Sequence, residues 1–140
     1  MNASDALLKS YYDALSGNVS LPVYSAPPAD LTTGYVYIAF DSGGNDGDKT
    51  AKTYRKQIGI EVHVPNDNYS AGRKAAYDVL EEVETAVWPE IGATVDMTDT
   101  GYHMISQALI DMGADDTLYS IERVVRVFLI FEVQFELITS

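Results

Sequence analysis

The spacing of apolar residues near the start of the chain predicts a helix. These residues recur at three- and four-residue intervals: Leu7, Leu8, Tyr11 and Leu15. Ser4 precedes this run, and its side chain can accept hydrogen bonds from the free N–H groups of the first helical turn. We therefore expect a short amphipathic helix, capped by Ser4, at the N-terminus.

A second amphipathic helix is predicted further along the chain. Ser70 is placed to cap its start, and Trp88 precedes Pro89, which disfavours helical backbone at that residue and ends the helix. Between these two points the apolar residues form one stripe: Ala75, Ala76, Val79, Leu80, Val83 and Val87.

Several segments have the composition of strands. Pro22, Pro27 and Pro28 interrupt the segment that follows the first helix and restrict residues 22–24 to a short edge strand. Residues 35–40 are β-branched and aromatic, and residues 57–64 alternate between apolar and polar side chains. The segment 121–138 alternates as well, but both of its faces are apolar between residues 124 and 130. A strand that is apolar on both faces belongs in the interior of a sheet.

Residues 102–112 fit two patterns. A helix would place one set of apolar residues on one face: Ile105, Leu109 and Met112. A strand would display another set: Met104, Ala108 and Ile110. The strand interpretation is favoured here, and the helix remains the alternative.

Residues 41–52 separate two predicted strands and contain almost no apolar residue. The segment is too long for a tight hairpin turn, so we expect a mobile loop. It does not match a phosphate-binding P-loop, because Asp48 stands before Lys49 where the P-loop requires glycine. It does not match a calcium-binding loop either, because Asp46 occupies the glycine position and Lys52 the position of the bidentate glutamate.

The order of these elements is helix, strands, helix, strands, which predicts an α+β fold. We expect a mostly antiparallel twisted sheet with two helices packed on it. No internal repeat and no linker divides the chain, so residues 1–140 are expected to form one domain. A hydrophobic content of 46% and a mean hydropathy of −0.07 agree with a soluble globular domain.

Composition excludes several classes of function. Nine Lys and Arg residues stand against 21 Asp and Glu, which gives a net charge of −12, the wrong sign for a general nucleic-acid binder. There is no cysteine, and therefore no disulfide, thiolate metal site or cysteine nucleophile. No stretch approaches the roughly 18 apolar residues that cross a bilayer, and the N-terminus lacks the pattern of a secretion signal. We expect the protein to begin in the cytoplasm.

The sequence contains no recognisable catalytic, cofactor or metal motif, and we expect the protein not to be an enzyme. The two histidines, His63 and His103, are isolated from each other, and no serine lies in a nucleophile-elbow pattern. We expect His63 to be a partly exposed strand residue beside Glu61.

Two groups of charged residues depart from the acidic background. Basic residues gather within eight positions at the end of the predicted loop and the start of the next strand: Lys49, Lys52, Arg55 and Lys56. Carboxylates gather toward the end of the second helix, against the preference of the helix dipole: Glu81, Glu82 and Glu84. Each group is either a solvated, locally balanced surface or a contact surface for an oppositely charged partner.

The layout of the chain resembles the tail terminator proteins of long-tailed bacteriophages, which are also called tail completion or tail-to-head joining proteins. The resemblance covers nearly the whole chain and rests on the order of its elements. It runs through the N-terminal helix, the proline-flanked segment at residues 21–28, the strand from Tyr35, the polar loop, the strand at 58–64, the helix after Ser70 and the Val- and Phe-rich C-terminal strand.

This resemblance implies a structural virion protein. It implies a subunit that closes into a ring, a hexamer, on the head-proximal end of the tail tube, ends tube polymerisation and presents a surface to the head completion protein. Assembly would take place in the host cytoplasm, and DNA would pass through the ring without specific binding. Neighbouring subunits of a ring meet through two different patches, and the basic and acidic groups named above are candidates for them.

Two alternatives remain. The first is another neck or tail-tube component of a virion. The second belongs to a different class: a small ligand-binding or enzymatic α+β domain whose site uses tyrosine, aspartate and backbone groups. Ten tyrosines make the second alternative conceivable, since tyrosine serves in both pockets and interfaces.

Overall fold

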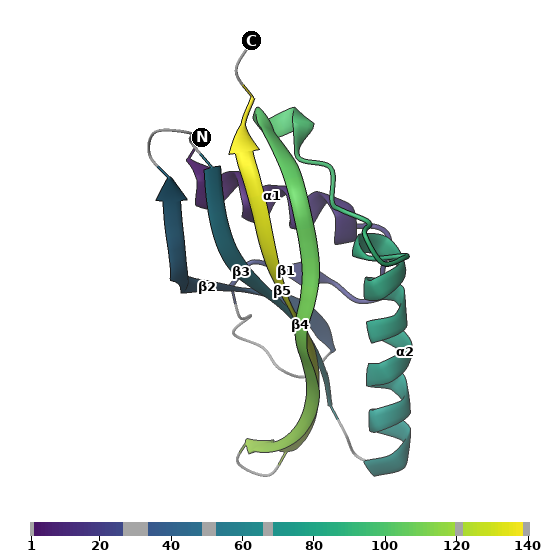
Figure 1. Ribbon diagram of the computed structural model, residues 1–140. Coiled ribbons are helices and arrows are strands. Elements are labelled where there is room, and N and C mark those ends of the chain that lie inside the picture. Colours follow the sequence, from purple (N-terminus) through teal and green to yellow (C-terminus); the bar gives the residue numbers. More distant parts are fainter. Residues whose placement is uncertain (1, 27–33, 49–52, 66–68, 120–121, 139–140) are drawn as a thin grey trace.

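The computed structural model describes residues 2–26, 34–48, 53–65, 69–119 and 122–138 (Figure 1). Five strands form one sheet in the order β1-β2-β3-β5-β4, with β1 parallel to β2 and every other pair antiparallel. The elements follow one another as α1 (Ala3–Leu15), β1 (Val23–Tyr24), β2 (Tyr35–Asp48), β3 (Thr53–Pro65), α2 (Tyr69–Val87), the 3-10 turn η1 (Thr98–Thr100), β4 (Tyr102–Tyr119) and β5 (Glu122–Leu137). The predicted α+β fold with two helices on a mostly antiparallel sheet is confirmed.

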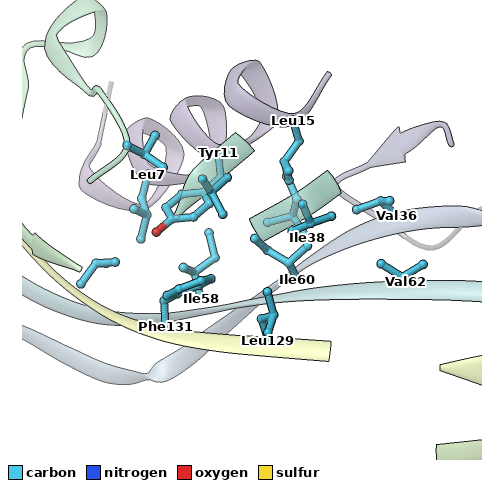
Figure 2. Packing of buried hydrophobic residues seen from close by; sticks show 14 of the residues in the cluster. Leu7, Tyr11, Leu15, Val36, Ile38, Ile58, Ile60, Val62, Leu129 and Phe131 are labelled. Carbon is cyan, nitrogen blue, oxygen red and sulfur yellow. The ribbon is translucent and has the colours of Figure 1, made fainter. Parts of the chain in front are cut away.

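Both helices pack on the same face of the sheet and enclose the core (Figure 2). Alternate residues of β3 and β5 point toward the helices because successive side chains of a strand lie on opposite faces. The core unites these residues with the apolar stripes of α1 and α2, including Leu7, Tyr11, Leu15, Ile58, Ile60, Leu80, Val83, Leu129 and Phe131. Each such side chain contributes roughly 1.5–3 kcal/mol when it is removed from water.

The starts of the helices differ from the prediction. Asn2, not Ser4, caps α1: its Oδ1 accepts a hydrogen bond of 2.8 Å from the backbone N–H of Asp5. Asparagine is as good a cap as serine, and the helix begins at Ala3, two residues earlier than a cap at Ser4 would allow. Helix α2 begins at Tyr69, so Ser70 lies inside its first turn rather than at its cap. The predicted end of α2 before Trp88 is confirmed.

The predictions for β1 and β5 are confirmed. β1 is a two-residue outer strand, paired through Val23 with Val36. β5 lies between β3 and β4, as its two apolar faces indicated. Its core-facing residues are fully buried from Val125 to Phe135, while the opposite face is half-exposed at Phe128 and Ile130.

The expectation of a loop at residues 41–52 is wrong for most of that segment. β2 continues to Asp48, and after an irregularity between Asp41 and Asp46 it pairs again with β3, from Arg55 to Thr53. Residues 49–52 lie outside the described part of the chain. The error has a physical reason: ladder hydrogen bonds join backbone groups, so a long partner strand can pair with residues of low strand propensity.

Residues 102–112 form a strand, as favoured. β4 pairs with β5 along its length, with register shifts at Ile105 and Ile110. These bulges break the strict alternation, because each extra residue shifts the following side chains relative to the sheet. Met104 and Gln107 are buried, whereas Ala108 is exposed, so the face predicted for a regular strand is not preserved.

Candidate interface surfaces

The outer side of α2 borders an acidic groove. The groove has a volume of ≈ 610 Å³ and is lined by Asn18, Asp78, Glu81, Glu82, Thr85 and Ala86. Glu82 is engaged within the chain: its carboxylate accepts hydrogen bonds from the backbone N–H of Ser20 at 2.9 Å and from the Ser20 hydroxyl. Glu81 is exposed and Glu84 is half-exposed. Glu81 is therefore the carboxylate of the predicted acidic group that is most accessible to a partner.

A second groove adjoins the first, because Asn18 and Ala86 line both. It has a volume of ≈ 380 Å³ and adds the carboxylates of Asp13, Asp96 and Asp99. Hydrogen bonds from the backbone N–H and the hydroxyl of Thr98, at 2.9 Å and 2.7 Å, lower the pKa of Asp96 and keep it ionised. The charged side chains that line the two grooves are carboxylates, and two of them, Asp13 and Asp78, are paired with Lys9 and Lys74. Residues 75–122 contain no lysine or arginine.

The predicted basic group lies elsewhere. Arg55 and Lys56 lie near the start of β3, on the left in Figure 1, whereas α2 lies on the right. The Arg55 side chain is 64% exposed, and its Nε is 3.9 Å from Glu132, a loose contact. Lys56 is only 9% exposed, so it presents little charge to a neighbour. Lys49 and Lys52 lie outside the described residues.

The structure thus keeps the basic and acidic groups apart within one copy. Among the described members, Arg55 offers a positive charge at one side and Glu81 a negative charge at the other. The assignment of these residues to an interface stays a prediction. Their separation is compatible with a contact between two copies through different patches.

A charged cluster lies on the face of the sheet opposite the helices. Glu61 Oε1 is 2.9 Å from His63 Nε2 and accepts a hydrogen bond of 2.7 Å from Arg126 Nε. His63 stacks on Tyr35 with a centroid distance of 4.7 Å, and the Arg126 guanidinium lies 4.5 Å above the ring of Phe128. His63 is beside Glu61 as expected, but it is 7% exposed, so the expectation of partial exposure is wrong.

Burial opposes the ionisation of Glu61, but its partners outweigh this effect. Hydrogen bonds from His63 and Arg126, together with the positive charge of Arg126, hold the pKa of Glu61 at about 2. The sequence analysis missed Arg126 because its neighbourhood depends on the pairing of β3 with β5, where His63 stands opposite Arg126. The spacing of Glu61 and His63 was the only signal of this cluster in the sequence.

Two further findings concern the described residues only. They contain no group of three or more histidine, aspartate or glutamate side chains positioned to hold a metal ion. Neither α1 nor α2 is both long and apolar enough to span a membrane.

Comparison with known proteins identifies the fold. No protein-family model matches the sequence, and no curated protein matches it. A chain from the virion of a native gene transfer agent particle has a similar structure, with a TM-score of 0.69 and 22% identity, and the match covers 97% of this chain and 99% of that chain. A second solved structure matches with a TM-score of 0.50 and 15% identity over 95% of this chain and 96% of that chain. At these identities the likeness concerns the fold.

Proposed function

We propose that this chain is a structural protein of a phage-like virion and not an enzyme. The observation that carries the proposal is the likeness to a chain of a gene transfer agent virion over nearly the full length of both chains. The layout of helices and strands along the sequence supports the same class.

Within that class we propose the role of a tail terminator. Copies of the chain form a ring, a hexamer, on the head-proximal end of the tail tube, stop its polymerisation and present a surface to the head completion protein. The net charge of −12 suits such a ring, because an acidic lumen repels DNA and lets it pass without being held. In the assembled virion the protein would lie at the head-proximal end of the tail.

The subunits of the proposed ring meet through different patches. The side that carries Arg55, with Lys49 and Lys52 nearby in the sequence, would face the α2 side of the next copy, which carries Glu81. An exposed ion pair contributes roughly 0–1 kcal/mol, and burial in an interface increases both the attraction and the cost of desolvation. Because the exposed part of this contact is screened by salt, ring assembly should weaken as ionic strength rises.

Native mass measurement and negative-stain microscopy test this function. The chain is studied alone and together with tubes of the tail tube protein encoded near its gene. We expect a discrete ring, or a monomer that becomes a ring on contact with tubes, and density at one end of each tube. A strict monomer that leaves tube growth unchanged would exclude the terminator role.

The same experiment separates the alternative within the class. Another neck or tube component would be incorporated along the tube or would bind only the head-side neighbour, and tube length would not depend on its concentration. A terminator instead shortens tubes when it is added during their growth.

A matched charge exchange tests the contact itself. Arg55→Glu should disrupt the ring, and Glu81→Arg in the same chain should restore it, because the pair is then reversed rather than lost. Arg55→Lys serves as the control, since it keeps a positive charge at the same position and should leave the ring intact.

A further inference from the structure

Strand β4 forms one edge of the sheet, and the outer side of its backbone is open. It spans 18 residues, and in the described sheet its neighbour is β5. Between residues 103 and 119 the described chain offers it no backbone hydrogen bond beyond those of this ladder. The N–H and C=O groups along an open edge can pair with an added strand, and such pairing joins proteins to one another.

This edge also exposes large apolar side chains. Ile105, Ile110 and Met112 are 44%, 48% and 53% exposed, and all three lie within residues 105–112. Ile105 and Ile110 stand at the bulges of β4, and bulges hinder pairing with an arbitrary strand. The exposed apolar groups indicate a contact surface, and the bulges limit it to a strand of matching position and direction.

The opposite edge of the sheet is open at the same height. β1 pairs with β2 only as far as Tyr37, so from Ile38 to Asp48 β2 is the outermost described strand on its side. Successive cross-strand pairs through β3 and β5 place Ile38 level with Met112, and Asp48 level with His103. The open part of β2 therefore spans the same levels as the part of β4 that exposes its apolar side chains.

The directions of the two edge strands suit a head-to-tail contact. β2, β3, β5 and β4 are antiparallel in turn, so β2 and β4 run in opposite directions. A rotation about an axis along the strands keeps these directions, so β4 of one copy meets β2 of the next as an antiparallel pair. At the far end Figure 1 shows β4 curving away from the line of its upper part, which leaves room for β1 of the next copy.

We propose that β4 of one copy pairs with β2 of the next copy and continues the sheet around the ring. The proposal rests on the ring proposed above and names a contact that closes it. β2 is irregular between residues 41 and 46, so the contact consists of two short ladders, at residues 38–41 and 46–48 of β2. Closure of the sheet into a ring removes both open edges.

The positions of the carboxylates are compatible with this pairing, although both strands are acidic. At matched levels no aspartate of β2 stands opposite an aspartate of β4. The pairs are Asp41 with Ala108, Asp46 with Ser106, Asp48 with His103 and Ala39 with Asp111. Two β4 strands could also cover each other, but this contact joins identical edges and gives a closed dimer instead of a ring.

The chain contains no cysteine, so introduced thiols test the contact directly. A chain with Ala39→Cys and Asp111→Cys is assembled and treated with a thiol crosslinker of about 8 Å, which reaches opposite and diagonal residues of paired strands. We expect linked dimers, trimers and larger species on a denaturing gel. Within one copy three strand spacings, about 14 Å, separate these two positions, so the linker cannot join them there.

Two control chains isolate the proposed pairing. Ala39→Cys with Thr85→Cys moves the second thiol to an exposed position on α2, on the other face of the sheet, and should give no such series. Asp111→Cys alone gives a linked dimer only if two β4 strands meet, and it should stay unlinked.

A second pair of variants tests the apolar part of the edge. Ile110→Glu should weaken assembly of the ring by about ten- to a hundredfold per contact, because it replaces an aliphatic side chain that the contact buries. Ile91→Glu is the matched control: Ile91 is also exposed, at 91%, but lies in the connection after α2 and outside the proposed contact. Circular dichroism confirms that both variants fold.

The outcomes distinguish this inference from the function on which it rests. If the parent chain forms rings in which the thiols at positions 39 and 111 do not link, the strand contact is refuted while the ring stands. Linkage of Asp111→Cys alone, or normal assembly of Ile110→Glu, refutes the contact as well. If the parent never forms a ring, with or without tubes, both proposals fail.

Discussion

Replacement of Gln107 by leucine should destabilise the fold more than the loss of an ordinary core residue. Gln107 is 5% exposed and joins three elements: it accepts from Tyr11 of α1 and donates to the carbonyls at the end of α2 and in the following turn. Leucine fills a similar volume but can make none of these hydrogen bonds. Gln107→Leu would leave the Tyr11 hydroxyl and the Val87 carbonyl buried without partners.

The magnitude follows from those two groups. A buried polar group without a partner costs about 1–3 kcal/mol, so the two groups together should lower the free energy of unfolding of Gln107→Leu by about 2–6 kcal/mol. Domains of this size are stable by about 5–15 kcal/mol, so the loss is a large fraction of the total. Tyr11→Phe in the parent chain should cost about 1 kcal/mol. In the Gln107→Leu chain the same change should be neutral or stabilising, because it removes the orphaned hydroxyl.

Urea unfolding followed by circular dichroism gives the four free energies of this double-mutant cycle. The measurements need a protein concentration at which the free subunit is the only species, because association would add stability by mass action. The expected loss for Gln107→Leu corresponds to a decrease in Tm of about 3–4 °C per kcal/mol. If Tyr11→Phe costs the same in both backgrounds, within about 0.5 kcal/mol, the two side chains do not cooperate and the argument is wrong.

Two further predictions concern the face of the sheet opposite the helices. Because the pKa of Glu61 is about 2 rather than its ordinary 4.5, its ionised form contributes stability that is complete above about pH 4.5 and is lost as the pH falls through about 2. Glu61→Gln should therefore flatten the unfolding profile in that window, and an unchanged profile would refute the role given to the cluster. Gly113→Ala should cost about 1–2 kcal/mol, since its Cβ would lie 2.7 Å from Cζ of Phe128. Phe128→Leu in the same chain should recover most of this loss in thermal unfolding, and a fully stable Gly113→Ala would contradict it.

Periodicity predicted the elements whose pattern is set by burial. The stripes of α1 and α2 face the core, and the two apolar faces of β5 indicated its interior position. The short edge strand β1 was predictable for a different reason, because prolines restrict where it can pair. For the two helices and β5 the decisive interaction is the removal of apolar surface from water, and this leaves a direct mark on the order of residues.

The features that were missed depend on pairings between distant segments. β2 extends through glycine and aspartate because β3 supplies a backbone partner, which no local pattern reveals. His63 is buried because Tyr35 of the adjacent strand stacks on it. Gln107 became a core residue because a bulge in β4 turned it toward Tyr11. The acidic groove was predictable only in part: Glu81 and its neighbours were recognised, but the carboxylates of Asp13 and Asp96 join them only in the folded chain.

The distribution of charge also limits how copies of this chain can meet. Residues 75–122 contain no lysine or arginine. They include most of α2, the connection between α2 and η1, and all of β4. If two copies met through identical patches around α2, carboxylates would face carboxylates, and like charges repel most strongly where water is excluded. A head-to-tail contact avoids this, because it can bring the acidic side of one copy against the exposed Arg55 of the next, which lies on the face of the sheet opposite the helices. The distribution of charge therefore favours contact between two different patches on neighbouring copies, which is the kind of contact that closes into a ring.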